Sequence, residues 1–402
     1  MSLRAPFARS FVVVFLAALS PLLTGCGGGA GTKGPAKAAV NTLPPANPVA
    51  VAKMVQGVKA AADAATRPRA IVLLKEAASI DPNLWEARFD LGVVYATTGD
   101  LAAAETELNA ARKLAPESSE VVSALAEVQR RRGEEKDAVE TLGDFVQSHP
   151  DALDLRAQYV AALRGSGQVD KAITEAREVL VRRSGDAAAL AELALCHLAK
   201  GERDVATLLA KQAVDSNTKS AAGHRAQGLI ALDAGDDALA FQSFQKAAQA
   251  DPKDTTARLN MGAVLLRAGV YPKAEEQFRA ILEVVPDDSD AMIGLAAALR
   301  GQAEGKNEKK LEEAKTLLEK VLAKDPHMVS ANFNLGVLYA DFLKKPDLAK
   351  PLFERFLDDA HPYHPARQEA ERYMKTLANA APAPPPTPPP AAPAAPAKGK
   401  KG

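Results

Sequence analysis

Residues 251–286 read DPKDTTARLNMGAVLLRAGVYPKAEEQFRAILEVVP, and this stretch decides the fold. It holds two segments in which apolar residues recur at helical spacing, with Gly269 between them and Pro286 after the second. Glycine supplies the positive φ that a tight turn between helices needs, and proline cannot continue a helix. Gly262 on the first segment and Ala274 on the second leave room for close packing. The stretch therefore predicts a hairpin of two short helices, which is marginal alone and must stack on others.

The same pattern recurs about every 34 residues, which indicates a repeat protein. Units begin near residues 85, 119, 153, 187, 221, 255, 289 and 329. We expect six glycines in turns with positive φ, namely Gly99, Gly133, Gly167, Gly201, Gly235 and Gly269. The unit at 289 carries six extra residues around 301–306, and the unit at 329 carries one near 344–346. Residues 51–84 read as a degraded unit whose first helix lacks the Leu-Gly pair seen at Leu91-Gly92.

These units resemble the tetratricopeptide (TPR) repeat, with a large apolar residue and Gly on the first helix and Ala-x-x-x-Phe on the second. The resemblance implies an all-α fold, a right-handed superhelical solenoid of helix-turn-helix repeats with a concave face. Eight repeats would span residues 85–362, after the degenerate repeat at 51–84. A capping helix would follow over 363–378. The composition agrees, because aromatic residues make up only 5% of the chain.

The N-terminal residues 1–25 have the three parts of a signal peptide. Arg4 and Arg9 precede an apolar run over 11–19, which is too short to span a bilayer. The run ends in Leu23-Thr24-Gly25-Cys26, which resembles the bacterial lipobox. That resemblance implies cleavage before Cys26, acylation of this cysteine, and a lipid-anchored protein that faces the periplasm. Gly27 stands where an inner-membrane retention signal would have Asp, so we expect the outer membrane. The alternative is a secretory peptide with an incidental cysteine.

Two segments flank the repeats and show no apolar period. Residues 26–50, which begin at the lipidated cysteine, are mainly Gly, Ala, Pro, Lys and Thr, which is typical of a flexible linker. Residues 379–402 are Ala/Pro-rich and end in Lys398, Lys400 and Lys401. This tail is expected to be disordered or polyproline II, acting as a spacer or as a ligand that contacts peptidoglycan or a partner protein. The alternative is a solubilising tail.

The sequence offers no catalytic site, cofactor site or metal site that we would assign. A formal G-x-G-x-x-G at 29–34 follows no strand and opens no βαβ unit. The six histidines form no zinc motif, and Cys196 in an apolar helical pattern is expected to be buried and inert. Without residues 1–25 the chain has two more acidic than basic residues, so nucleic acid is not an expected partner. We expect no enzyme activity and no small-molecule substrate.

The resemblance places certain first-helix positions on the concave face, and these form the expected partner-binding groove. In this sequence they have an apolar centre between arginines: Arg130, Arg131, Arg164, Leu195, Leu198, Arg225, Leu229, Leu232, Leu266, Arg267 and Arg300. Such a groove suits a partner segment that is apolar in its middle and acidic at its ends, because arginine binds carboxylates with two hydrogen bonds. The alternative is that the arginines pair with acids of neighbouring helices or extend into solvent. The carboxylate clamp of chaperone-type TPR proteins is not matched.

We therefore expect a lipid-anchored TPR scaffold that binds envelope proteins in the assembly or operation of a cell-envelope machine. The chain is similar to TPR lipoproteins of gliding motility and to pilotins of type IV pili, which suggests motility or secretion. The alternative is a periplasmic regulator that binds cell-wall synthesis enzymes or peptidoglycan.

Overall fold

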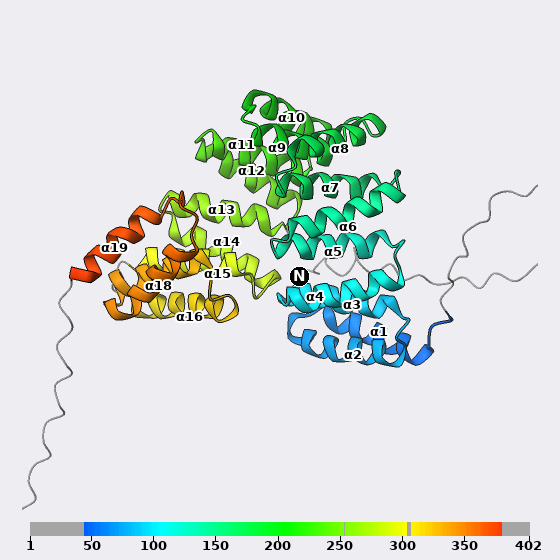
Figure 1. The fold of residues 1–402 in the computed structure, drawn as a ribbon, viewed down its shortest axis with the longest axis horizontal. Helices are drawn as coiled ribbons and strands as arrows, with labels where there is room; N and C mark the ends of the chain where they lie inside the picture. Colours follow the sequence, from blue (N-terminus) through cyan, green and yellow to red (C-terminus); the bar gives the residue numbers. More distant parts are fainter. Residues whose placement is uncertain (1–43, 253, 304–306, 380–402) are drawn as a thin grey trace, which may run out of the picture. The chain divides into compact units, whose positions relative to one another are not determined.

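The computed structural model describes residues 44–252, 254–303 and 307–379. Within these ranges the chain is helical and contains no strand (Figure 1). The helices are α1 Pro48–Ala61, α2 Arg67–Ile80, α3 Trp85–Thr98, α4 Leu101–Leu114, α5 Ser119–Arg131, α6 Glu135–Ser148, α7 Leu153–Gly165, α8 Val169–Arg182, α9 Ala187–Ala199, α10 Arg203–Ser216, α11 Ala221–Asp233, α12 Asp237–Ala250, α13 Thr255–Arg267, α14 Tyr271–Val284, α15 Ser289–Ala303, α16 Glu308–Lys324, α17 Val329–Val337, α18 Pro346–Asp359 and α19 Arg367–Asn379. They fall into two compact units that divide between Leu295 and Ala296, and each unit is described by itself.

From α1 to α14, and again from α16 to α19, each helix packs against the next one in the sequence, as expected for a TPR solenoid. The predicted turn glycines have positive φ: Gly99, Gly133, Gly167, Gly201, Gly235 and Gly269, with values from 70° to 82°. Several helices begin with a side-chain cap at the residue before them; for example, Asp236 accepts a hydrogen bond from the backbone of Leu239 at 2.9 Å. Short helices, glycine turns and caps together produce the helical hairpins that the sequence predicts.

In several hairpins, a position on the first helix and one on the second fit each other in size. Where the first helix has glycine, a large side chain from the second helix fills the space; a Cβ on Gly228 would lie 2.5 Å from Cε1 of Phe244. Where the second helix has only Ala176, the first helix carries Val160, and both are fully buried. The glycine pairs of this kind are Gly57/Leu74, Gly92/Leu108, Gly228/Phe244, Gly262/Phe278 and Gly336/Phe353.

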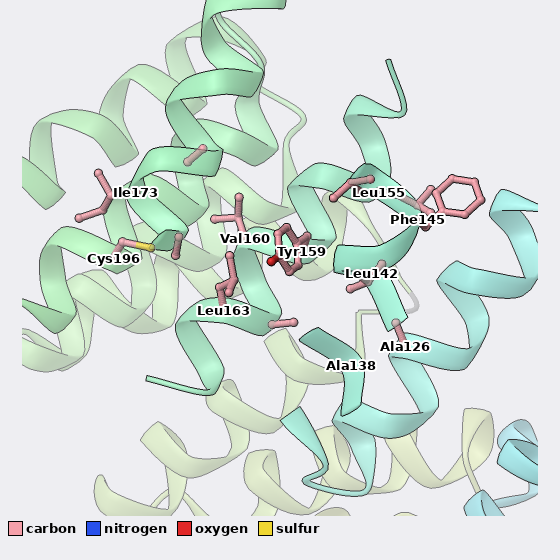
Figure 2. Close-up of a cluster of buried hydrophobic side chains, with 14 of the residues drawn as sticks. Ala126, Ala138, Leu142, Phe145, Leu155, Tyr159, Val160, Leu163, Ile173 and Cys196 are labelled. Carbon is pink, nitrogen blue, oxygen red and sulfur yellow. The ribbon is translucent and has the colours of Figure 1, made fainter. Parts of the chain in front are cut away.

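The core is a series of clusters between neighbouring hairpins. Figure 2 shows one of them, in which Leu142, Tyr159, Val160 and Leu163 meet side chains from the helices before and after. Cys196 belongs to this cluster and is fully buried, which raises the pKa of its thiol to about 11. A protonated, buried thiol is unreactive, in agreement with the expectation from its apolar surroundings in the sequence.

The first hairpin differs from its sequence interpretation in two respects. Helix α1 begins at Pro48, three residues before the expected boundary, because the side chain of Asn47 accepts a hydrogen bond from the backbone of Val49 at 2.9 Å. The glycine that seemed to be missing is Gly57, whose ideal Cβ would lie 2.7 Å from Cγ of Leu74. Gly92 makes the equivalent approach to Leu108, also at 2.7 Å. Residues 48–80 therefore pack as an ordinary repeat.

The two insertions change helices as well as loops. Helices α15 and α16 have 15 and 17 residues, against 13 or 14 in the repeats before them. The single extra residue expected near 344–346 is accommodated earlier, in a π-helical turn, η3, over Leu338–Phe342. Its backbone bond from Leu343 N to Leu338 O, at 2.9 Å, spans five residues instead of four. The chain then turns at Lys344, whose φ is +52°.

Helix α19 follows the last hairpin and stacks its Tyr373 ring on Phe353, with the ring centres 4.7 Å apart. It begins at Arg367, inside the span expected for a capping helix. The expected signal peptide, the lipobox with Cys26, most of the linker and nearly all of the tail lie outside the described residues. Within the described residues, no helix combines the length and the apolar character needed to cross a membrane.

Candidate partner-binding face

Leucines of three consecutive first helices make up what we call the leucine face: Leu195 and Leu198 on α9, Leu229 and Leu232 on α11, and Leu266 on α13. Helices α9 and α11 contact each other directly. Leu195 is buried, whereas the other four are half-buried. Leu198 and Leu229 pack against one core cluster, and Leu229 and Leu232 pack against the next. The face is therefore a partly exposed apolar surface on a rigid base.

The arginines next to this face bind acids of the chain itself. Nε of Arg164 on α7 donates to Glu192 on α9 at 3.0 Å. Nη1 of Arg225 on α11 donates to Asp254 at 2.6 Å. Because the side chain of Asp254 is only 5% exposed and also caps α13, this second pair holds two repeats together. These contacts agree with the alternative in which the arginines pair with neighbouring helices.

The remaining arginines also have partners. Arg267 donates through Nε to Asp237 at 2.8 Å, and Arg131 donates to the carbonyl of Ala96 at 3.0 Å. Arg130 lies 3.6 Å from Glu127 and 3.5 Å from Glu135. Arg300 belongs to the second unit, so the structure does not place it beside the other arginines. An acidic partner segment would therefore have to replace carboxylates that are already bound.

Sequence reasoning missed a set of polar residues at the fourth position of the first helix. Their side chains reach back and bind a backbone carbonyl, which lies in the turn before the helix except at Arg156, whose acceptor is in the last turn of α6. Nε2 of His224 lies 3.0 Å from the carbonyl of Thr218, and Nδ2 of Asn332 donates to Pro326 at 2.9 Å. Arg156 and Arg258 make longer bonds, both at 3.4 Å, to Val146 and Pro252 respectively. The signal was available, since each residue stands at the same place in its repeat.

In the described part of the chain, the histidines make local contacts. His149, His197 and His327 each contact one carboxylate, of Glu117, Glu202 and Asp359 respectively. In the HPYH segment, His361 and His364 each accept a backbone N–H two residues further on. Burial, followed by the neighbouring Glu86, raises the pKa of Asp90 to about 7. Across the described ranges, no three potential metal ligands come together.

Comparison with known proteins gives a consistent result. Family models described as tetratricopeptide repeat match residues 66–128, 124–152, 160–215, 199–255, 231–299 and 299–365. No curated protein matches the sequence. A chain of the crystal structure of the APC/C hetero-tetramer Cut9-Hcn1 is similar, with a TM-score of 0.51 and 15% identity over 78% of this chain and 59% of that chain. The described fold thus matches 59% of the length of that relative, and at this identity the likeness concerns the fold alone.

Two further solved structures align with lower scores. Pseudomonas aeruginosa pilF aligns at a TM-score of 0.40 and 19% identity, over 48% of this chain and 90% of that chain. YrrB, described as a TPR protein with an unusual peptide-binding site, aligns at a TM-score of 0.34 and 19% identity, over 48% of this chain and 96% of that chain.

Proposed function

Because the chain belongs to the tetratricopeptide repeat family, we propose that it is a lipid-anchored scaffold of the cell envelope that binds a partner protein through the leucine face. Solenoids of this kind present an extended surface for other proteins. The leucine face supports the proposal, because its leucines lie on consecutive first helices and four of them keep part of their surface in solvent. Neighbouring apolar side chains on a rigid base are the usual centre of a protein interface.

The partner segment that fits this surface has an apolar stripe, as an amphipathic helix does. Its flanking acids would bind by exchange with Glu192 and Asp237, which now occupy Arg164 and Arg267, whereas the buried Asp254 keeps Arg225. Such exchange gives little net affinity, since each new ion pair replaces an existing one. The apolar stripe therefore carries most of the affinity, and the acids contribute mainly to orientation.

The test is co-purification from native membranes with the acylated full chain, followed by mass spectrometry. We expect Leu198→Asn with Leu232→Asn to lose specific envelope proteins that the parent chain captures. The matched control is Leu208→Asn with Leu239→Asn, which changes two exposed leucines on the second helices α10 and α12. Capture that is equal in both double variants would refute the leucine face.

The lipid anchor and the compartment need a separate experiment. We expect Cys26→Ser to release the protein from the outer-membrane fraction, since acylation of this cysteine is what the lipobox resemblance implies. Metabolic labelling with a fatty acid should mark the parent chain and leave the variant unlabelled. A labelled variant would contradict the anchor. The motility or secretion role would be supported if the captured partners were components of such a machine.

A further inference from the structure

Residues of three consecutive helices, α6, α7 and α8, line a hollow with a volume of about 520 Å³. Cavities of this size hold small molecules in other proteins. Helix α6 contributes Val139, Glu140, Gly143 and Val146, α7 contributes Tyr159, and α8 contributes Lys171. None of these residues belongs to the leucine face, so the hollow is a second candidate site and is independent of the proposed function.

Gly143 opens the hollow, because every other second helix has a longer side chain at the same position of its repeat. The equivalent residues are Lys75, Asn109, Arg177, Lys211, Gln245, Arg279, Glu319 and Glu354. A glycine inside a helix is destabilising relative to alanine, so its place here needs a local reason. An ideal Cβ on Gly143 would lie 3.2 Å from Oη of Tyr159, so the glycine leaves this hydroxyl accessible from the hollow.

The hydroxyl of Tyr159 is the unusual group at the base of the hollow. Its residue stands where the neighbouring repeats have Leu125 and Leu193, and it is only 4% exposed within the cluster of Figure 2. A buried tyrosine normally gives its hydroxyl a hydrogen-bond partner. Within the described residues this hydroxyl has no such partner. A ligand in the hollow would supply one.

Most of the charged groups around the hollow are already neutralised by other side chains. Arg156 on α7 pairs with Glu175 on α8. Asp144 on α6 lies 3.5 Å from Arg112 on α4. These contacts hold the helices together, so their charges are not available to a ligand at low cost.

One cation and one carboxylate remain, on opposite helices of the hollow. In the part of the chain that the structure describes, neither Lys171 on α8 nor Glu140 on α6 takes part in an ion pair. Nζ of Lys171 lies 5.3 Å from the centre of the Tyr159 ring, so the ammonium group and the tyrosine hydroxyl face the same space. The hollow therefore offers two donors at one side and a carboxylate at the other.

We propose that this hollow binds an α-amino acid with an apolar side chain. The carboxylate of the ligand accepts hydrogen bonds from Lys171 and Tyr159, and its ammonium group donates to Glu140. The apolar side chain packs against Val139 and Val146, which also line the hollow. Because the ligand contacts α6 and α8, its binding joins the second helices of two consecutive repeats.

The test is isothermal titration calorimetry with the full chain in detergent solution and L-leucine as the probe. We expect a dissociation constant of about 1 mM or below. Two analogues test the two charges of the ligand separately. Leucinamide lacks the carboxylate and 4-methylpentanoate lacks the ammonium group, so each should bind at least about ten-fold more weakly than L-leucine.

Variants at the base of the hollow separate binding from folding. Tyr159→Phe should bind L-leucine about ten-fold more weakly and unfold in urea as the parent chain does, because the lost hydroxyl has no partner in the described chain. Gly143→Asn with Tyr159→Leu recreates the Asn109 and Leu125 of the preceding repeat. This double variant should remain helical by circular dichroism and lose binding, since its new side chain fills the hollow.

Lys171→Gln should also lower the affinity about ten-fold. Its matched control is Lys211→Gln, which changes an exposed lysine on α10 and should bind as the parent chain does. The proposal is wrong if L-leucine gives no binding at about ten times the expected dissociation constant. It is equally wrong if the analogues bind as tightly as L-leucine, if Tyr159→Phe binds like the parent chain, or if both lysine variants lose the same affinity.

Discussion

The size match between paired helices gives the sharpest prediction, and Gly228→Ala is the change that tests it. Alanine normally stabilises a helix interior by about 1 kcal/mol relative to glycine. Here the new methyl group would lie 2.5 Å from Cε1, 2.7 Å from Cδ1 and 2.8 Å from Cζ of Phe244. The ring cannot move into solvent, because Phe244 is fully buried.

The two effects have opposite signs, so their magnitudes decide the outcome. Overpacking by a methyl group costs about 1–3 kcal/mol, and a contact against three atoms of a fixed ring belongs at the upper end. After subtraction of the helix preference, we expect Gly228→Ala to lower the free energy of unfolding by about 2 kcal/mol. Phe244→Leu alone should cost about 1 kcal/mol, since it leaves a small cavity.

The double variant is the decisive measurement. It recreates the Ala126/Leu142 pair, whose members are 1% and 0% exposed in another repeat. We therefore expect Gly228→Ala with Phe244→Leu to be at least as stable as Phe244→Leu alone, a coupling energy of about 2 kcal/mol. Urea unfolding followed by circular dichroism at 222 nm reports on all helices. Trp85, the single tryptophan, reports on the first units and should change less.

Two results would refute this reasoning. If Gly228→Ala were as stable as the parent chain, the ring would have room to move and the glycine would not be required by packing. If the costs of the two changes simply added, the two side chains would not be in contact.

Three further predictions concern side chains of the first unit. Burial raises the pKa of Asp90 from its ordinary value of 3.8 to about 7 in the folded chain. The folded form therefore binds the proton more tightly, and the stability from this group falls as pH rises from about 4 to 7. Asp90→Asn should be more stable than the parent chain at pH 8, by about 1–2 kcal/mol for this partly exposed group, and show no gain at pH 4. An equal gain at both values would exclude the carboxylate as the cause. Arg225→Ala should lower the free energy of unfolding in urea by about 2 kcal/mol, because it leaves the buried Asp254 without its cation. The control Arg203→Ala removes an exposed pair with Asp233 and should lower it by under about 0.5 kcal/mol. Equal costs would contradict the role of burial. Cys196 is buried, and its thiol has a pKa of about 11. It should therefore react with Ellman's reagent in the folded chain at least about a hundred-fold more slowly than in urea. Rapid reaction without urea would show that this cluster opens.

The sequence was informative wherever a local rule decides the structure. Gly99 and Gly269 were predicted to have positive φ because a short turn between helices requires it, and both do. The all-helical repeat fold was predicted from the 34-residue period, and the family models confirm it. In each case the determining residues are close together in the chain or recur at a fixed spacing.

The sequence was less informative where partners are distant or where the backbone has alternatives. Arg164 and Glu192 are 28 residues apart, so their contact depends on how two repeats stack. Gly57 was overlooked because Gln56 replaces the leucine that normally precedes it, although packing requires only the glycine. The extra residue of the last repeat could have extended a loop, but the backbone takes it up in η3, where one hydrogen bond spans five residues.

The matched pairs inside the hairpins also limit how the gene of this protein can change length. Repeat genes gain and lose units by recombination between similar segments. A crossover at the turn between two helices could join the first helix of one unit to the second helix of another. Joining α7 to α12 would place Val160 against Phe244, two large side chains where the parent units have one. Exchange of whole units at their outer boundaries keeps each pair together, whereas exchange within a hairpin keeps the fit only between units whose pairs match in size, such as Gly228/Phe244 and Gly262/Phe278.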